Sequence, residues 1–231
     1  MRIKIELSGT KESLPINNQH LVNSFIHKIL GNNNKFHDSS SNYSVSQLCG
    51  GKMNDDKQTL SFINSAFIIV SSQNMEFINK IIVGLLNNKD FGYGIEFKNI
   101  SFIEEKFYDG WNHFFTLSPI LIKERIDEKK YKFVTVNDVD YSEKLKQHIL
   151  RKLKAIDSTL ILDDFELLLG DKYKVKKILV KNVINHASVV KLSIKTNKKV
   201  AEILYNNGVG QSTGSGFGTI YKTENLDLYK F

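Results

Sequence analysis

The sequence predicts an α+β fold, because strand-like and helix-like segments follow one another in a recognisable order. In the first half that order is strand, helix, strands, helix, strand, which is the order of a split β-α-β unit. The second half of the 231-residue chain repeats it loosely. Apolar residues make up 41% of the chain, enough for an ordinary folded core. We therefore predict two tandem ferredoxin-like (RRM-like) domains, each an antiparallel sheet with helices on one face.

The first domain is predicted in residues 1–115. Residues 2–7 alternate between polar and apolar side chains, which is typical of a strand with one buried face. Asn17 or Asn18 can cap a helix whose apolar residues recur at helical spacing up to Gly31. Residues 31–56 are rich in Asn, Ser and Gly, so we predict a long loop there. The remaining predicted elements are strands at 60–63 and 66–70, a helix at 74–86 and a strand at 94–107.

The second domain is predicted in residues 116–231, after a junction near residue 115. A hairpin is expected between its two helices, from the strand-like stretches Lys172–Val183 and Ser188–Lys195. The predicted elements are strands at 119–126 and 131–135, a helix at 140–155, strands at 173–183 and 187–195, a short helix at 197–206 and a last strand at 217–223. Sheets of this type often present an open face to single-stranded RNA.

The formal net charge of +7 favours a polyanionic partner, of which nucleic acid is the commonest. The abundance of Lys and Asn is also what an AT-rich genome would produce. The single cysteine, Cys49, excludes an internal disulfide, and no Cys/His group has zinc-ligand spacing. The apolar runs are too short to span a bilayer. We predict a cytoplasmic protein without structural metal, cofactor or membrane contact.

A glycine-rich stretch, GVGQSTGSGFGTIY, occupies residues 208–221 and contains five glycines within eleven residues. It does not fit a dinucleotide fingerprint, because Thr213 stands where the third glycine should be and the predicted helix precedes the loop. It does not fit a Walker loop either, since no lysine occurs between Gly208 and Gly218. Glycines can expose backbone N–H groups that bind an anion, so we expect a surface for a phosphate backbone.

This stretch, with a helix before it and a strand after it near the end of a tandem ferredoxin-like chain, resembles the stand-alone CRISPR repeat endoribonuclease family of the repeat-associated superfamily. Other segments agree in order and spacing along nearly the whole chain. They are MRIKIEL, NNQHLVNSFIHKIL, KFHDSSSNYSVSQL before a short F/Y-x-x-S strand, IIVGLL and FFTLSPILI. The resemblance implies a metal-independent endoribonuclease that cleaves precursor CRISPR RNA within its repeats and leaves 5′-hydroxyl and 2′,3′-cyclic or 3′-phosphate ends.

Such a reaction uses the 2′-hydroxyl of the RNA as nucleophile and needs a general base and a general acid, for which histidine is well suited. His37 occupies the position of the family's catalytic histidine. His27 stands where some relatives have a tyrosine, and it is the candidate partner acid or base. Some relatives carry a lysine after the histidine, where this chain has Ser39, Ser40, Ser41 and Asn42. The other histidines are interpreted as capping, packing or solvated: His20 at the helix start, His113, His148 on a helix surface and His186 in a hairpin turn.

Two groups of residues are predicted to bind RNA. In the glycine-rich stretch they are Gly208, Gly210, Gln211, Ser212, Thr213, Gly214, Gly216 and Gly218. Family loops often carry a basic residue where this chain has Gln211, Ser212 and Thr213. In the hairpin they are Lys174 and Lys176, on one strand face, since the resemblance implies that this hairpin approaches the RNA.

The implied partners are CRISPR repeat RNA and other CRISPR effector subunits, with the protein a monomer or a homodimer. Two alternatives stay open at this point. One is a catalytically inactive relative that holds guide RNA in an effector complex. The other is an unrelated tandem RNA-recognition module, whose central strands should be rich in aromatic residues; GSGFGTIY alone comes close to that pattern.

Overall fold

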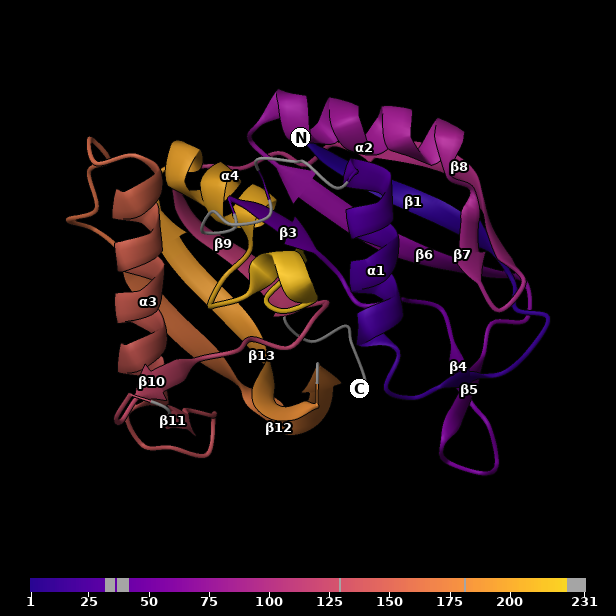
Figure 1. Ribbon diagram of the computed structural model, residues 1–231. Helices are drawn as coiled ribbons and strands as arrows, with labels where there is room; N and C mark the ends of the chain where they lie inside the picture. Colours follow the sequence, from indigo (N-terminus) through magenta and orange to yellow (C-terminus); the bar gives the residue numbers. More distant parts are fainter. Residues whose placement is uncertain (32–35, 37–41, 129, 181, 224–231) are drawn as a thin grey trace.

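The structure is a computed structural model that describes residues 1–31, 36, 42–128, 130–180 and 182–223 (Figure 1). The chain forms two antiparallel sheets with a pair of helices against each. The helices are α1 (Gln19–Leu30), α2 (Met75–Asn87), α3 (Tyr141–Ile156) and α4 (Lys198–Asn207), with a short 3-10 helix, η1, at Thr213–Ser215. Gly31, at φ +80°, ends α1 as the sequence predicts. Asn18 stands at the N-cap of α1, but its side chain makes no capping hydrogen bond. The side chain of Asn74, which was not predicted as a cap, accepts from the first turn of α2.

The first sheet has five strands. In spatial order they are β3 (Tyr43–Val45), β6 (Ser65–Ser72), β1 (Arg2–Ser8), β8 (Ile95–Ile103) and β7 (Asp90–Gly92). Apolar residues of β1 and β6, such as Ile5 and Ile68, pack against Phe25 of α1 and Ile78 of α2. A small three-stranded sheet joins β2 (Leu14–Pro15), β5 (Thr59–Ser61) and β4 (Lys52–Met53) beside it.

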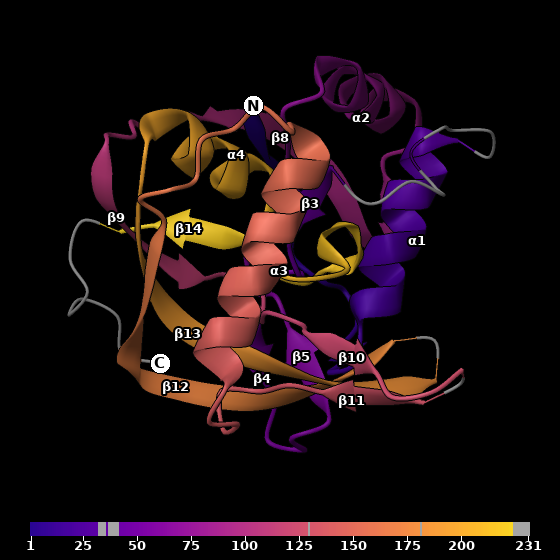
Figure 2. The ribbon, with the colours of Figure 1, turned by 90° about the vertical axis from the view of Figure 1, so that its left-hand side faces the viewer.

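The second sheet has four strands, and α3 and α4 cover one of its faces (Figure 2). In spatial order its strands are β12 (Glu166–Val180), β13 (Val183–Thr196), β9 (Gly110–Thr116) and β14 (Ile220–Lys222). Numbered within its own half and leaving out the edge strand β7, each sheet has the order second, third, first, fourth. This shared antiparallel order confirms the predicted pair of ferredoxin-like units.

Three element predictions need correction. The predicted loop at 31–56 contains β3 and β4, and β3 is fully buried at the edge of the first sheet. The stretch before residue 117, interpreted as a junction, is β9, a central strand. The predicted strand at 119–126 is only β10 (Lys123–Arg125), which pairs with β11 (Tyr131–Phe133) outside the main sheet. Its apolar residues, Ile120 and Leu121, are buried, and Ile120 forms an isolated bridge to Ser188 of β13 rather than part of a full strand.

The predicted domain boundary at residues 115/116 falls within β9, which pairs with β13 and β14. A boundary between β8 and β9 would keep the second sheet whole. The exact division of the chain into domains remains a prediction.

Buried polar contacts join the two halves. The guanidinium group of Arg2, in β1, donates to the carbonyl oxygens of Tyr205 and Ile220 and stacks 3.4 Å from the ring centroid of Tyr205. In β3, the Ser44 hydroxyl lies 2.7 Å from that of Thr219. The buried terminal nitrogens of Arg2 find these two carbonyl partners only when both halves are in place. We infer that the orientation of the two sheets is fixed by these contacts.

Within the described ranges, no helix combines the length and the apolar composition that a membrane-spanning helix requires.

Candidate active site

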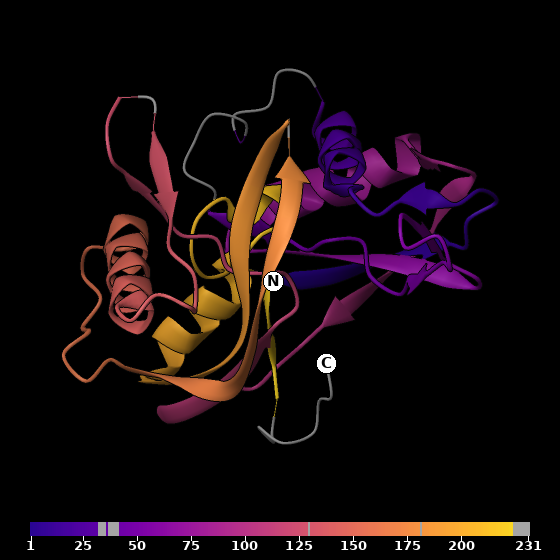
Figure 3. The ribbon, with the colours of Figure 1, turned by 90° about the horizontal axis from the view of Figure 1, so that it is seen from below.

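A cleft lies between α1 and the second half of the chain, with a volume of about 470 Å³. Helix α1 lines it with His20, Asn23, Ser24 and His27, which share one face because they are three, four and seven residues apart. The opposite wall comes from the far end of the β12–β13 hairpin, from Lys123 and from the glycine-rich stretch. Seen from below, the end of the orange β12–β13 hairpin lies beside the indigo helix α1 (Figure 3). We call this feature the α1 cleft.

Two imidazoles therefore border one cleft. The rings of His20 and His27 stand about two helical turns apart, both on the exposed side of α1. His27 was predicted as a catalytic group, and the structure places it in the cleft. His20 was interpreted as a capping or solvated residue, yet it lines the same cleft. The signal that could have identified it is its seven-residue spacing from His27. The other predicted catalytic residue, His37, lies outside the described residues.

The glycine-rich stretch folds into the junction between the halves. Its backbone N–H groups at Gly208, Val209 and Gly218 donate to the carbonyl oxygens of Leu204, Gly218 and Pro119. Gly208, Gly216 and Gly218 are buried, and Gly210 and Gly214 are partly buried. The expectation of bare N–H groups along the whole loop is therefore wrong for Gly208 and Gly218. Ser212 is exposed and Ser215 partly exposed, and both line the α1 cleft.

Two polar side chains of this stretch have structural partners. The Gln211 side chain accepts from the Lys123 amide at 2.8 Å and donates to the Lys123 carbonyl at 3.1 Å. The hydroxyl of Thr213, itself buried, donates to the carbonyl of Tyr43 in the first sheet at 2.8 Å. Through these contacts the side chains of Gln211 and Thr213 hold the loop in place, at positions where family loops often carry a basic residue. The predicted roles of Gln211 and Thr213 in RNA binding have no support in these contacts.

A lysine lies beneath the loop. Lys152 of α3 donates to the carbonyls of Asn207 at 2.7 Å and Gly208 at 3.2 Å, and to the Thr213 hydroxyl at 3.0 Å. Burial lowers the pKa of this amine to about 7. It binds the C-terminal end of α4, where carbonyl groups lack helical partners. Lys152 was not singled out in the sequence, since nothing in its local pattern separates it from the surface lysines of the same helix.

Lys174 and Lys176 project from β12, two residues apart and therefore on one face of the strand. They do not line the α1 cleft. Lys176 instead borders a second hollow of about 470 Å³, together with Lys177 and the start of α1 at Asn18 and Gln19. Burial, and then the neighbouring charge of Lys174, lower the pKa of Lys176. Their proximity gives this end of the hairpin a local positive charge.

The remaining histidines lie elsewhere. The Nδ1 atom of His113, in β9, is 2.9 Å from the Ser193 hydroxyl. His148 is partly buried on α3, and burial followed by the charge of Arg151 lowers its pKa. His186 was predicted in a hairpin turn but lies within β13, where its ring stacks on Phe133. None of these three lines the α1 cleft.

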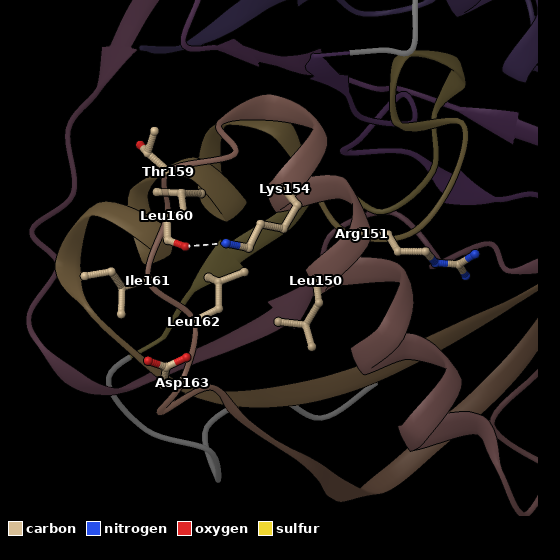
Figure 4. A pocket seen from close by; sticks show the side chains of 8 residues that line it. All are labelled: Leu150, Arg151, Lys154, Thr159, Leu160, Ile161, Leu162 and Asp163. Atoms are coloured by element: carbon tan, nitrogen blue, oxygen red, sulfur yellow. Dashed lines mark hydrogen bonds between the residues drawn. The ribbon is translucent and has the colours of Figure 1, made fainter.

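A third hollow, larger than the α1 cleft, has a volume of about 700 Å³ and lies beside the end of α3. Figure 4 shows its eight lining residues, all from the stretch 150–163: Leu150, Arg151, Lys154, Thr159, Leu160, Ile161, Leu162 and Asp163. Lys154 donates to the carbonyl of Leu160 at 2.7 Å and so ties the loop to the helix. We call it the α3 hollow. No histidine lines it, and its titratable side chains are Arg151, Lys154 and Asp163, so we do not choose it as the candidate active site.

Among the described residues, no three His, Cys, Asp or Glu side chains come together as metal ligands would. The expectation of an activity without metal remains a prediction.

The comparison with known families identifies the class of protein. Residues 103–221, just over half of the chain, match the family described as CRISPR associated protein Cas6, C-terminal. The chain belongs to the Cas6 family, which confirms the resemblance inferred from the sequence. A tandem ferredoxin-like fold with a glycine-rich loop after its last helix is consistent with this assignment.

Named relatives agree along most of the chain. It is 28% identical over 245 residues to "CRISPR-associated endoribonuclease Cas6 1" of Methanocaldococcus jannaschii, covering 97% of this chain and 93% of that protein. It is also 28% identical over 160 residues to "Putative CRISPR-associated endoribonuclease-like protein Cas6" of Pyrococcus furiosus, covering 66% of each. A solved structure of a Cas6-related protein from Pyrococcus furiosus has a TM-score of 0.85, 24% identity and coverage of 98% of this chain and 99% of that one.

Proposed function

We propose that the protein is an endoribonuclease that cleaves precursor CRISPR RNA within its repeats, without a metal ion. Membership of the Cas6 family and the names of its relatives support RNA cleavage. The observation that carries the proposal on this chain is the α1 cleft, which brings two imidazoles to face hydroxyl groups and a lysine from the second half.

The proposed reaction is an attack by the RNA 2′-hydroxyl on the adjacent phosphorus. A general base removes the proton from the 2′-oxygen, and a general acid gives one to the departing 5′-oxygen. The products carry a 2′,3′-cyclic phosphate and a 5′-hydroxyl, and opening of the cyclic phosphate would give a 3′-phosphate. His37 is the proposed base or acid and His27 its partner, since an imidazole exchanges protons near neutral pH. His20 lines the same cleft and is a second candidate for the partner role.

The RNA backbone is proposed to follow the rim of the cleft. Ser212, Gly214 and Ser215 are accessible residues of the glycine-rich stretch and would supply neutral donors. Lys174 and Lys176 would bind phosphates further along the strand, beside the second hollow. Repeat RNA is thus the proposed partner; other CRISPR effector subunits and a monomeric or homodimeric state remain predictions.

The test is a cleavage assay on the host's own repeat RNA in the presence of EDTA. We expect site-specific cleavage by the wild-type protein, and its loss when the attacking 2′-hydroxyl is replaced by hydrogen. His37→Ala and His27→Ala are each expected to lower the rate about 10²- to 10⁴-fold, because each would remove one proton-transfer group. Circular dichroism of both variants checks that the fold is intact.

The outcomes separate the alternatives. Tight binding of the repeat without any cleavage would favour the relative that only holds guide RNA. Cleavage that requires added metal would contradict the proposed mechanism but not the substrate. Cleavage with undiminished rates in both histidine variants would contradict the assignment of the site.

A further inference from the structure

Lys123, at the start of β10, borders the α1 cleft on the wall that faces His27. It comes from the second half of the chain, so the cleft has its imidazoles on one side and an ammonium group on the other. Among the described residues that line the cleft, Lys123 is the only lysine or arginine. A lysine side chain is ordinarily charged at neutral pH, whereas the charge of a histidine changes as it exchanges protons.

Hydrogen bonds from the glycine-rich stretch hold the backbone of Lys123 in place. Gln211 reaches across from the glycine-rich stretch and hydrogen-bonds both its amide, at 2.8 Å, and its carbonyl, at 3.1 Å. The backbone N–H group of Gln211 donates to the carbonyl oxygen of Leu121, two residues before Lys123, at 2.9 Å. Because three hydrogen bonds connect these segments, the start of the Lys123 side chain is fixed relative to Ser212 and Ser215.

The Lys123 ammonium group is not paired with a carboxylate in the described part of the chain. Its neighbour Glu124 points elsewhere and pairs with Lys144, at 2.6 Å. The Lys123 Nζ atom lies 5.6 Å from the centre of the Phe133 ring, which stacks in turn on His186. Partial burial lowers the pKa of Lys123. A cation that is partly desolvated and without a counterion gains most from an approaching anion.

The proposed cleavage also requires stabilisation of negative charge on the phosphate, which proton transfer by the histidines does not provide. As the 2′-oxygen bonds to phosphorus, the non-bridging oxygens gain negative charge, and this charge falls again when the bond to the 5′-oxygen breaks. A donor placed at these oxygens stabilises the transition state more than the ground state.

We propose that Lys123 is a catalytic residue whose ammonium group contacts a non-bridging oxygen of the scissile phosphate, and that Gln211 is the residue that positions it. This inference rests on the proposed function. Lys123 keeps its proton throughout: the proton of the 2′-hydroxyl goes to the general base and the 5′-oxygen receives one from the general acid.

The test measures chemistry and binding separately. Single-turnover cleavage of the repeat is followed at saturating protein, and affinity is measured with a repeat whose attacking 2′-hydroxyl is replaced by hydrogen. For Lys123→Ala we expect the rate to fall about 10²- to 10³-fold with affinity changed less than about threefold. Lys123→Arg should recover part of the rate, because it restores the charge. Lys89→Ala, an exposed lysine outside the cleft, is the control for the loss of one charge.

Gln211→Ala should lower the rate less than Lys123→Ala, with unchanged affinity, because it loosens the lysine without removing it. A Lys123→Ala rate within about threefold of wild type, alongside an inactive His37→Ala or His27→Ala, would overturn the role of Lys123 and leave the proposed function standing. Equal losses of rate and affinity would also overturn it, since they would make Lys123 a binding residue. If the wild-type protein does not cleave the repeat, the proposed function fails and this inference with it.

Discussion

The α1 cleft and the α3 hollow differ in how the chain builds them. The hollow is the larger, but all its lining residues come from the single stretch 150–163. The cleft draws on α1, on the segment around Lys123, on the β12–β13 hairpin and on the glycine-rich stretch. The cleft brings imidazole, hydroxyl and ammonium groups from different segments to face one another, and the α3 hollow has no imidazole. We choose the α1 cleft as the candidate active site because distant segments converge there, and not because of its volume.

The two repeated units produce this difference. In the first half, the strand that follows α1 is the three-residue β3, whereas in the second half the matching strand is the fifteen-residue β12. Because β12 and β13 extend past their own sheet, the end of the hairpin reaches α1 of the other half. The same topology with unequal strand lengths therefore gives one half the proposed proton-transfer groups and the other half the wall that faces them.

The largest expected effect distinguishes the two cavities by activity. His27→Ala should lower single-turnover cleavage of the repeat about 10²- to 10⁴-fold. Arg151→Ala, in the α3 hollow, should leave the rate within about twofold, because surface substitutions away from a site have small effects. The rates are measured at saturating protein, so that weaker binding does not contribute. A comparable loss in Arg151→Ala would remove the basis for choosing the cleft over the hollow.

The next effect concerns the stability that the close packing of the glycine-rich stretch, part of the cleft wall, gives to the protein. A Cβ atom at Gly218 would lie 1.8 Å from the carbonyl oxygen of Val209, and φ there is +63°. Gly218→Ala should therefore lower the free energy of unfolding by at least about 3 kcal/mol, from backbone strain and overpacking together. Urea unfolding measures it.

Gly110 provides the matched control for this substitution. Its φ is +102°, but a Cβ atom there would meet nothing within 4 Å. Gly110→Ala should cost only the backbone term, about 1–2 kcal/mol. Equal losses in the two variants would mean that the close approach to Val209 has no energetic weight.

The sequence predicts the regular part of the fold because helix caps and apolar periodicity are local signals. All four helices lie where the spacing places them, and α1 ends at Gly31 as predicted. Local patterns do not predict β3 or β9, for two different reasons, although the family resemblance includes a short F/Y-x-x-S strand that matches residues 43–46. β3 is only three residues long within a polar stretch, and β9 was interpreted as a junction because its pairing partners, β13 and β14, come about 80 to 110 residues later.

The resemblance supplied positions for candidate residues, whereas contacts between the two halves could not be read from the sequence. His27 lines the α1 cleft, and its catalytic role stays a prediction. His20, Lys123 and Lys152 were not selected, since each depends on which distant segment lies opposite. Gln211 and Thr213 were selected as RNA contacts, but their side chains hold Lys123 and Tyr43 instead. Hydrogen bonds between residues so far apart leave no trace in a local pattern.

A third prediction compares two lysines of α3, one under the cleft wall and one at the hollow. Lys152 has a pKa of about 7 in the folded protein, whereas its ordinary value is 10.5. Between these values the unfolded chain binds more protons than the folded one at this site. Deprotonation of Lys152 should therefore raise the free energy of unfolding as pH rises from about 7 to 10, by at most about 1.4 kcal/mol per pH unit.

Substitution isolates that contribution. Lys152→Met should remove this rise from the pH profile of the urea midpoint, measured between pH 7 and 10. Lys154→Met is the control, because Lys154 also donates to backbone carbonyls but is exposed at the α3 hollow. Parallel profiles for the wild-type protein and Lys152→Met would show that the buried amine does not titrate in this range.

The smallest expected effect concerns affinity and separates binding from cleavage. If Lys174 and Lys176 each neutralise one phosphate, the double alanine variant should reduce the slope of log affinity against log salt concentration by about 1.4, at about 0.7 per contact with single-stranded RNA. Its cleavage rate at saturating protein should stay unchanged, because neither lysine lines the α1 cleft. The matched control is the pair Arg151→Ala and Lys154→Ala at the α3 hollow, which removes the same net charge. If this control lowers the slope as much, the effect comes from overall charge, and the RNA is not held by the hairpin.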